Sequence, residues 1–277
     1  MTEPHSTVDS KYRAWLERQR KQHVSAFARR TLAVHARCLV PFLLPEMKVL
    51  DIGCGPGSIT CDIAHSVKPG IVTGMDTDDE MVELSRQLAT ERNLDSVVFQ
   101  IGDAHKLPFD DAEFDAILIH FVLQHVKNPG VVLSECRRVV KQEGVIVVAD
   151  TDLSATIIHP DGPWLAAFHQ YVVRLRELRE TSPTVGRQLR SLLDRAGFKS
   201  YLADIVPNFD GDTKSANRWA DGMVQSLRAP EAIEYAERHN LASASDLEAM
   251  ADAWEQWGRE SGAIYLRLHF QAIGKPI

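Results

Sequence analysis

The chain has 277 residues, of which 44% are hydrophobic and 25% are charged, and its formal net charge is −7 at pH 7. A chain of this length can bury a sizeable core, as one large domain or as a core domain with a smaller second lobe. The acidic net charge argues against a nucleic-acid partner, because such binding depends on the neutralisation of phosphates by lysine and arginine. We find no apolar run near the ~18 residues of a membrane span and no signal-peptide pattern, and therefore expect no membrane association.

The four cysteines match neither paired metal-binding motifs nor a disulfide framework. They are Cys38, Cys54, Cys61 and Cys136. Although 11 histidines are present, no HExxH or comparable ligand pair occurs, so we predict no metal site. These features together indicate a soluble protein of the reducing cytoplasm.

The N-terminal segment, residues 1–47, is predicted to form a helical cap. Basic residues outnumber acidic ones between Lys11 and Arg37. This pattern is typical of a helix with a solvated basic face, and a nucleic-acid-binding arm is the alternative.

From Lys48 to about Asp150, short β-branched runs alternate with helical patterns, which indicates a parallel sheet with crossover helices. The predicted strands are Val49–Ile52, Ile71–Met75, Val97–Ile101, Ala116–Ile119 and Val145–Ala149, and the predicted helices are Ser58–Ser66, Asp79–Arg92 and Pro129–Val140. These segments read as five βα units.

After Asp150 the pattern changes, and two mainly helical insertions are expected at about 155–183 and 209–260. Between and after them we expect a helix and a strand (Val185–Gly197 and Tyr201–Val206) and a final strand (Ala263–Ile273). The predicted fold class is α/β, with a doubly wound, seven-stranded, mostly parallel sheet and helical insertions after strands 5 and 6. Residues 48–277 then form one domain, with insertions placed where α/β enzymes build lids and substrate walls.

Aromatic residues recur at helical spacing in the first insertion, at Trp164, Phe168 and Tyr171. A stripe of this kind favours packing against the core. A lid over an apolar substrate is the alternative.

The most informative segment runs from Val49 to Gly57, where a strand leads into a glycine-rich turn and then a helix. Glycine permits positive φ and a close backbone approach, so Gly53, Gly55 and Gly57 allow a ligand to lie against the main chain. A GxG pattern gains weight from this strand–turn–helix context.

Two carboxylates follow the next two strands. Asp76 ends the second strand, where an acid accepts hydrogen bonds from a ribose diol in nucleotide-binding α/β folds. Asp103 follows the third strand, where it can accept from an adenine amino group. The apolar residues Met81 and Ala104 can pack on the two faces of the ring.

NAD and S-adenosylmethionine both suit such a site. The dinucleotide pattern G-x-G-x-x-G is absent, because Ser58 stands at the third glycine position. Asp51, beneath the turn, would repel a pyrophosphate but suits a ligand that carries an ammonium and a sulfonium group. Charge therefore favours S-adenosylmethionine.

The segment VLDIGCGPG resembles motif I of class I S-adenosylmethionine-dependent methyltransferases. The segments GMDTDDEM, GDAHKLPF and FDAILIHFVLQHV are similar to the ubiquinone/menaquinone-biosynthesis type over about Lys48–Asp150. The resemblance implies a Rossmann-like fold, with Asp51, Gly53 and Gly55 at the methionine end, Asp76 at the ribose, and Asp103 with Ala104 at the adenine. It also implies that His120 lies beside the cofactor.

Methyl transfer needs chiefly an aligned donor and acceptor, so a dedicated base is not required. If the acceptor is a hydroxyl or a carbon acid, a base helps, and the catalytic candidates are His120, His159 and Asp152. The predicted function is methyl transfer from S-adenosylmethionine to a small molecule, with S-adenosylhomocysteine as product. A cofactor-binding protein without transfer and an NAD-dependent oxidoreductase are the alternatives. The acceptor, its methylated atom and the oligomeric state stay open.

Overall fold

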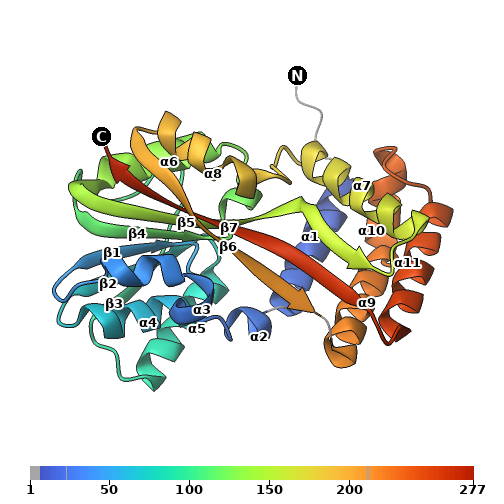
Figure 1. Ribbon diagram of the computed structural model, residues 1–277, viewed down its shortest axis with the longest axis horizontal. Helices are drawn as coiled ribbons and strands as arrows, with labels where there is room; N and C mark the ends of the chain where they lie inside the picture. Colours follow the sequence, from blue (N-terminus) through green and yellow to red (C-terminus); the bar gives the residue numbers. More distant parts are fainter. Residues whose placement is uncertain (1–6, 23, 211) are drawn as a thin grey trace. The chain divides into compact units, whose positions relative to one another are not determined.

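A seven-stranded sheet with the order β3-β2-β1-β4-β5-β7-β6 organises the chain, as seen in a computed structural model that describes residues 7–22, 24–210 and 212–277 (Figure 1). The strands are β1 (Lys48–Ile52), β2 (Ile71–Asp76), β3 (Val97–Ile101), β4 (Phe114–His120), β5 (Val140–His159), β6 (Phe198–Asp210) and β7 (Ile264–Pro276). The β1–β2, β2–β3, β1–β4 and β4–β5 pairs are parallel. Figure 1 shows β7 running in the opposite direction to β5 and β6, so the sheet is mixed but mostly parallel.

The helices follow the strands in the alternation that the sequence predicts for the first part of the chain. The α-helices are α1 (Thr7–Gln22), α2 (Val24–Phe27), α3 (Leu32–His35), α4 (Ser58–Val67), α5 (Asp79–Glu91), α6 (Pro129–Val139), α7 (Pro163–Leu178), α8 (Val185–Arg195), α9 (Thr213–Leu227), α10 (Pro230–Arg238) and α11 (Ala244–Arg259), and the 3₁₀ helices are η1 (Arg37–Phe42) and η2 (Leu123–His125). In the described part of the chain, no helix is long and apolar enough to cross a membrane.

Helices cover both faces of the sheet, and the side chains on both sides of its central strands are therefore apolar. The side chains of β1 alternate between two hydrophobic clusters: Leu50 and Ile52 pack in the cluster that includes residues of α6 and α8, and Val49 packs in the cluster that includes residues of α4 and α5. Burial on both faces explains the continuous Val/Ile/Leu runs that marked these strands in the sequence.

Two details of the sheet differ from the sequence prediction. The predicted strand Val145–Ala149 is the buried centre of a much longer strand, since β5 spans 20 residues. In addition, residues 102–113 join β3 to β4 without a helix, so the expectation of five regular βα units is wrong at this connection.

The chain divides into two compact units. Unit 1 comprises Met1–His23, Leu153–Pro183 and Pro207–Leu268, and unit 2 comprises Val24–Asp152, Thr184–Val206 and His269–Ile277. Unit 1 thus gathers segments from the predicted cap and from both predicted insertions, whereas Val24–Met47 groups with the sheet.

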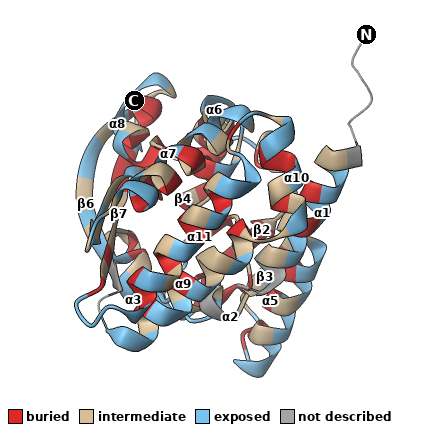
Figure 2. Ribbon diagram, turned by 90° about the vertical axis from the view of Figure 1, so that its right-hand side faces the viewer, coloured by how far each residue is buried: buried red, intermediate tan, exposed pale blue. Residues whose placement is uncertain are grey.

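Unit 1 has its own hydrophobic core, in which α7 and α11 contribute buried aromatic residues and α9 contributes buried aliphatic ones. Figure 2 shows the mixture of buried and exposed positions along α9 and α11. Phe168 and Tyr171 of α7 are buried in this core, as expected for a core-facing stripe, whereas Trp164 is 41% exposed.

The N-terminal helix α1 packs on α10 within unit 1. The rings of Tyr12 and Tyr235 stack with a centroid separation of 3.9 Å. Arg18 pairs with Glu231 at 2.7 Å and Lys11 with Glu234 at 3.3 Å. These pairs set two basic residues of the N-terminal segment opposite acids of the same unit.

Candidate functional site

The turn after β1 is a backbone bend that requires glycine. Gly53, Gly55 and Gly57 have φ of 72°, 53° and 79°, values that L side chains rarely adopt. A Cβ at Gly53 would lie 2.2 Å from Cγ2 of Val122, and one at Gly57 would lie 2.7 Å from Cβ of Ser85. A Cβ at Gly55 would meet nothing within 4 Å, so the bend leaves open space beside its backbone at this residue.

Asp76, at the end of β2, is hydrogen-bonded to this bend. Its Oδ2 accepts from the backbone N–H of Gly55 at 2.9 Å, and its Oδ1 accepts from the N–H of Asp78 at 3.1 Å. An ionised carboxylate has about four acceptor sites, so both oxygens keep capacity for further donors. The side chain is therefore held in one orientation, while both oxygens can still accept from further donors.

Asp51 lies one strand away in β1 and is only 2% exposed. Its Oδ2 accepts from the hydroxyl of Thr60 at 2.6 Å. Burial raises the pKa of Asp51 to about 7; the nearby charge of Asp76 adds to this rise, whereas the Thr60 hydrogen bond opposes it. A cation placed near this carboxylate would favour its ionised form.

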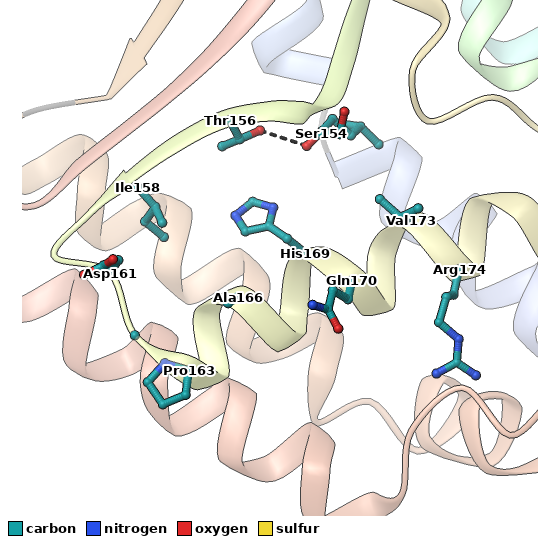
Figure 3. Close-up of a pocket in the computed structure, with 12 residues that line it drawn as sticks. Ser154, Thr156, Ile158, Asp161, Pro163, Ala166, His169, Gln170, Val173 and Arg174 are labelled. Atoms are coloured by element: carbon teal, nitrogen blue, oxygen red, sulfur yellow. Dashed lines mark hydrogen bonds between the residues drawn. The ribbon is translucent and has the colours of Figure 1, made fainter.

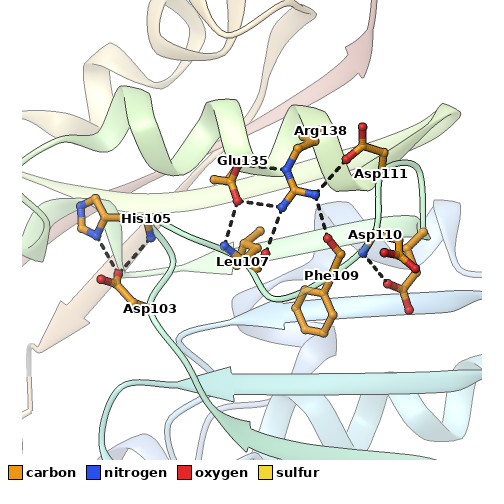
Figure 4. A network of polar contacts seen from close by, with 9 residues as sticks. Asp103, His105, Leu107, Phe109, Asp110, Asp111, Glu135 and Arg138 are labelled. Carbon is orange, nitrogen blue, oxygen red and sulfur yellow. Dashed lines mark hydrogen bonds and ion pairs between the residues drawn. The ribbon is translucent and has the colours of Figure 1, made fainter.

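Asp103 follows β3, which neighbours β2 in the sheet. The N–H of Gly102 donates to the carbonyl oxygen of Asp76 at 3.0 Å, so the ends of these two strands are joined. The Oδ1 of Asp103 accepts from the backbone N–H and from the Nδ1 of His105, at 2.9 and 2.7 Å (Figure 4). These bonds lower the pKa of Asp103 and keep it ionised.

The apolar residues expected near the adenine are buried, with Met81 4% and Ala104 7% exposed. Met81 lies in the first turn of α5, the helix that follows β2, and Ala104 follows Asp103. The strand ends of β1, β2 and β3 thus each carry one acidic residue, in the order that the sequence predicts.

A network that the sequence analysis did not anticipate fixes the connection between β3 and β4 (Figure 4). Glu135 accepts from the N–H of Leu107 at 2.8 Å, and the Arg138 guanidinium donates to the carbonyl oxygens of Leu107 and Phe109 at 2.9 and 2.7 Å. Glu135 and Arg138 also pair with each other on α6. The i, i+3 spacing of Glu135 and Arg138 was the sequence signal that could have predicted their ion pair. Their contacts stabilise the connection between β3 and β4, which contains no helix.

His120 ends β4 and is buried, at 7% exposure. The ring of His35 lies edge-on to it with a centroid separation of 6.3 Å. Burial lowers the pKa of His120 well below 6.5, and the positive charge of Arg30 lowers it further. The imidazole is therefore neutral near pH 7.

Sequence reasoning also missed the ring cluster around Phe121, the residue after His120. Phe121 has a φ of 59°, and its ring lies 4.5 Å from the ring of His269 and 4.7 Å from the Arg30 guanidinium carbon. The cluster joins residues separated by more than 200 positions in the chain, so no local pattern could reveal it.

The other two catalytic candidates lie in different surroundings. Asp152 is fully buried and pairs with the Nε of Arg187 within unit 2. His159 belongs to unit 1; its side chain is exposed, and its carbonyl oxygen accepts from Nε1 of Trp257 at 2.9 Å. Their catalytic roles stay predictions, and the buried ion pair gives Asp152 a structural role as well.

A family profile described as "Methyltransferase domain" matches residues 43–191, which is more than half of the chain. The chain belongs to this methyltransferase family. The match covers β1 to β5 and every strand-end acid described above, and the chain is a class I methyltransferase that depends on S-adenosylmethionine.

Curated relatives agree with this assignment. An uncharacterised methyltransferase of Schizosaccharomyces pombe is 28% identical over 82% of this chain and 84% of its own length. A demethylmenaquinone methyltransferase of Listeria welshimeri is 30% identical over 65% of this chain and 71% of its own length. With other relatives the match is partial: the chain spans 52% of the uncharacterised methyltransferase YcgJ of Bacillus subtilis, at 34% identity over 50% of this chain.

Solved structures agree on the fold. The YcgJ protein of Bacillus subtilis superposes with a TM-score of 0.57 at 19% identity, covering 87% of this chain and 97% of that one. A methyltransferase structure from Bacillus halodurans gives a TM-score of 0.58 at 18% identity, with coverage of 87% and 98%. At this level of identity the likeness concerns the fold alone.

Proposed function

We propose that this methyltransferase transfers the methyl group of S-adenosylmethionine to a small-molecule acceptor. The observation that supports the proposal most is the hydrogen bond from the Gly55 N–H to Asp76, because it joins a diol-binding carboxylate to a bend with open space beside its backbone. Four free cysteines and the acidic composition are consistent with a cytoplasmic protein that does not bind nucleic acid.

The residues at the strand ends fit this cofactor. In the proposed arrangement, Asp51 with the backbone of Gly53 and Gly55 faces the cationic methionine end, and Asp76 accepts from the ribose hydroxyls. Gly57 allows helix α4 to begin close to the bend.

At the other end of the cofactor, Asp103 accepts from the adenine amino group, with Met81 and Ala104 against the ring. The Asp103 oxygen that does not bind His105 is available for this contact. The sulfonium supplies an activated methyl group, and the chain has to align the acceptor with it and exclude water.

His120 is proposed to contribute a neutral imidazole at the end of β4. A neutral ring can accept a proton or a hydrogen bond from the acceptor, whereas an imidazolium would repel the cationic sulfonium. The low pKa of His120 makes it a weak base, so we expect positioning to be its larger contribution. His159 and Asp152 stay secondary catalytic candidates.

Methyl transfer is tested by incubating the protein with S-adenosylmethionine labelled in its methyl group, together with separate pools of metabolites, RNA and protein. We expect label in the metabolite pool, and much less of it when Asp76→Asn replaces the wild type at a low cofactor concentration. Asp95→Asn is the matched control, since Asp95 is exposed in the loop before β3. Label found only in RNA or in protein would refute the small-molecule proposal.

A further inference from the structure

Unit 1 contains a cavity that the site at the strand ends does not use. Its volume is about 960 Å³, and it lies between the end of β5, the turn at residues 161–163 and helix α7 (Figure 3). All of its lining residues belong to unit 1. The size falls within the range of small-molecule sites in proteins.

Apolar atoms supply most of the lining surface, and six of the twelve lining residues are polar or charged, with one carboxylate (Asp161) and one guanidinium (Arg174) among them. Leu153, Ile158 and Val173 supply apolar surface. The cation at the cavity, Arg174, donates to the backbone carbonyl oxygens of residues 240 and 241, at 2.5 and 3.0 Å, so its hydrogen bonds are directed at the protein. This chemistry suits a neutral, largely apolar ligand better than a polyanion.

His169 gives the cavity a specific polar contact. Its ring lies between α7 and β5 (Figure 3), 5.7 Å from the ring of Phe168 and 6.3 Å from that of Tyr265. Burial lowers the pKa of His169, which keeps the ring neutral near pH 7. Within residues 7–22, 24–210 and 212–277, the buried Nε2 atom has no hydrogen-bond partner. A buried nitrogen left unpaired is unfavourable, and a ligand oxygen at this point would satisfy it.

We propose that this cavity binds a neutral, mainly apolar small molecule through a hydrogen bond between its hydroxyl or carbonyl oxygen and His169. The proposal rests on the cavity and on the unpaired ring nitrogen, and it does not depend on the proposed function.

Binding is tested with a matched pair of probes, para-phenylphenol and biphenyl, which differ by one hydroxyl group. The wild type should bind para-phenylphenol about five- to tenfold more tightly than biphenyl, because one hydrogen bond is gained. His169→Phe should remove this preference, and His169→Gln should restore part of it. Equal preference in the wild type and in His169→Phe would overturn the role of His169.

The cavity itself is tested by filling it. Ala166→Phe, on the lining of α7, should abolish binding of both probes, whereas Glu177→Phe places the same side chain on the exposed surface of α7 outside the lining and should leave binding unchanged. Retention of probe binding by Ala166→Phe would overturn the assignment of the cavity. Circular dichroism and urea unfolding show whether each variant is folded.

The outcome does not depend on methyl transfer. If the wild type transfers no methyl group at all, the proposed function fails, and the two-probe titration still decides whether the cavity binds a ligand.

Discussion

Replacing Asp51 by asparagine should make the protein more stable above neutral pH, although Asp51 is proposed to face the cofactor. The carboxylate is buried, with Thr60 as its hydrogen-bond donor at 2.6 Å. Burial raises its pKa from 3.8 to about 7. An asparagine side chain keeps an oxygen that can accept from Thr60 and has no charge to bury.

The magnitude follows from the difference in pKa between the folded and the unfolded chain. The folded chain holds the proton more tightly, so the stabilising contribution is complete below pH 3.8, falls as the pH rises, and is lost above about pH 7. A shift of about three units at about 1.4 kcal/mol per unit corresponds to about 4 kcal/mol. Asp51→Asn does not titrate, so its free energy of unfolding lacks this decline.

Urea unfolding of the wild type and Asp51→Asn measures the effect. Between about pH 5 and about pH 8, the difference in unfolding free energy should grow by about 3 kcal/mol in favour of the variant. Asp95→Asn serves as the control and should follow the wild type. Parallel stability–pH curves for the wild type and Asp51→Asn would refute the assigned pKa shift.

The same carboxylate should couple cofactor binding to a proton. A bound sulfonium or ammonium favours the ionised form of Asp51, so binding of S-adenosylmethionine near pH 7 should release a proton. Calorimetry in two buffers of different ionisation enthalpy detects this release. Asp51→Asn should show no buffer dependence from this site, and it should bind the cofactor more weakly.

Three further predictions concern other parts of the site. Gly57→Ala should destabilise the protein by about 2–4 kcal/mol in urea unfolding, because residue 57 has a positive φ and the Cβ of the alanine would meet Ser85. A variant as stable as the wild type would contradict the assigned bend. The low pKa of His120 predicts that its imidazole stays neutral, so the pH profile of kcat should show no titration of this residue between about pH 6 and 8. An inflection of the wild-type profile in this range that disappears in His120→Ala would contradict the prediction. Arg187→Ala should lower the unfolding free energy by roughly 2 kcal/mol, since it removes a partner of buried Asp152; if Asp152→Asn instead abolishes turnover at unchanged stability, Asp152 is catalytic.

The sequence predicted the parts of the fold whose signals are local. Strands such as Val49–Ile52 and Ile71–Met75 are short apolar runs between glycine and helix signals, and the structure has β1 and β2 within one residue of these bounds. The glycine bend and the acidic residue at the end of each of the first three strands could likewise be predicted from the sequence, because each lies at or just beyond a strand end.

Features that depend on distant residues could not be predicted. The extension of β5 to 20 residues was not predicted, because polar residues such as Asp150, Asp152 and Ser154 interrupt the apolar run of its buried centre. The buried charge of Asp152 requires Arg187, which lies 35 residues away. The cavity beside His169 similarly arises from the packing of α7 against β5, which no single segment specifies.

The central claim is tested most directly by titrating S-adenosylhomocysteine into the wild type and into Asp76→Asn. The claim predicts that the wild type binds this ligand and not NAD, that Asp76→Asn binds it roughly 10- to 100-fold more weakly through loss of charge-assisted hydrogen bonds to the ribose, and that Asp95→Asn binds it like the wild type. Unchanged affinity in Asp76→Asn would contradict the placement of the cofactor at the strand ends of β1, β2 and β3.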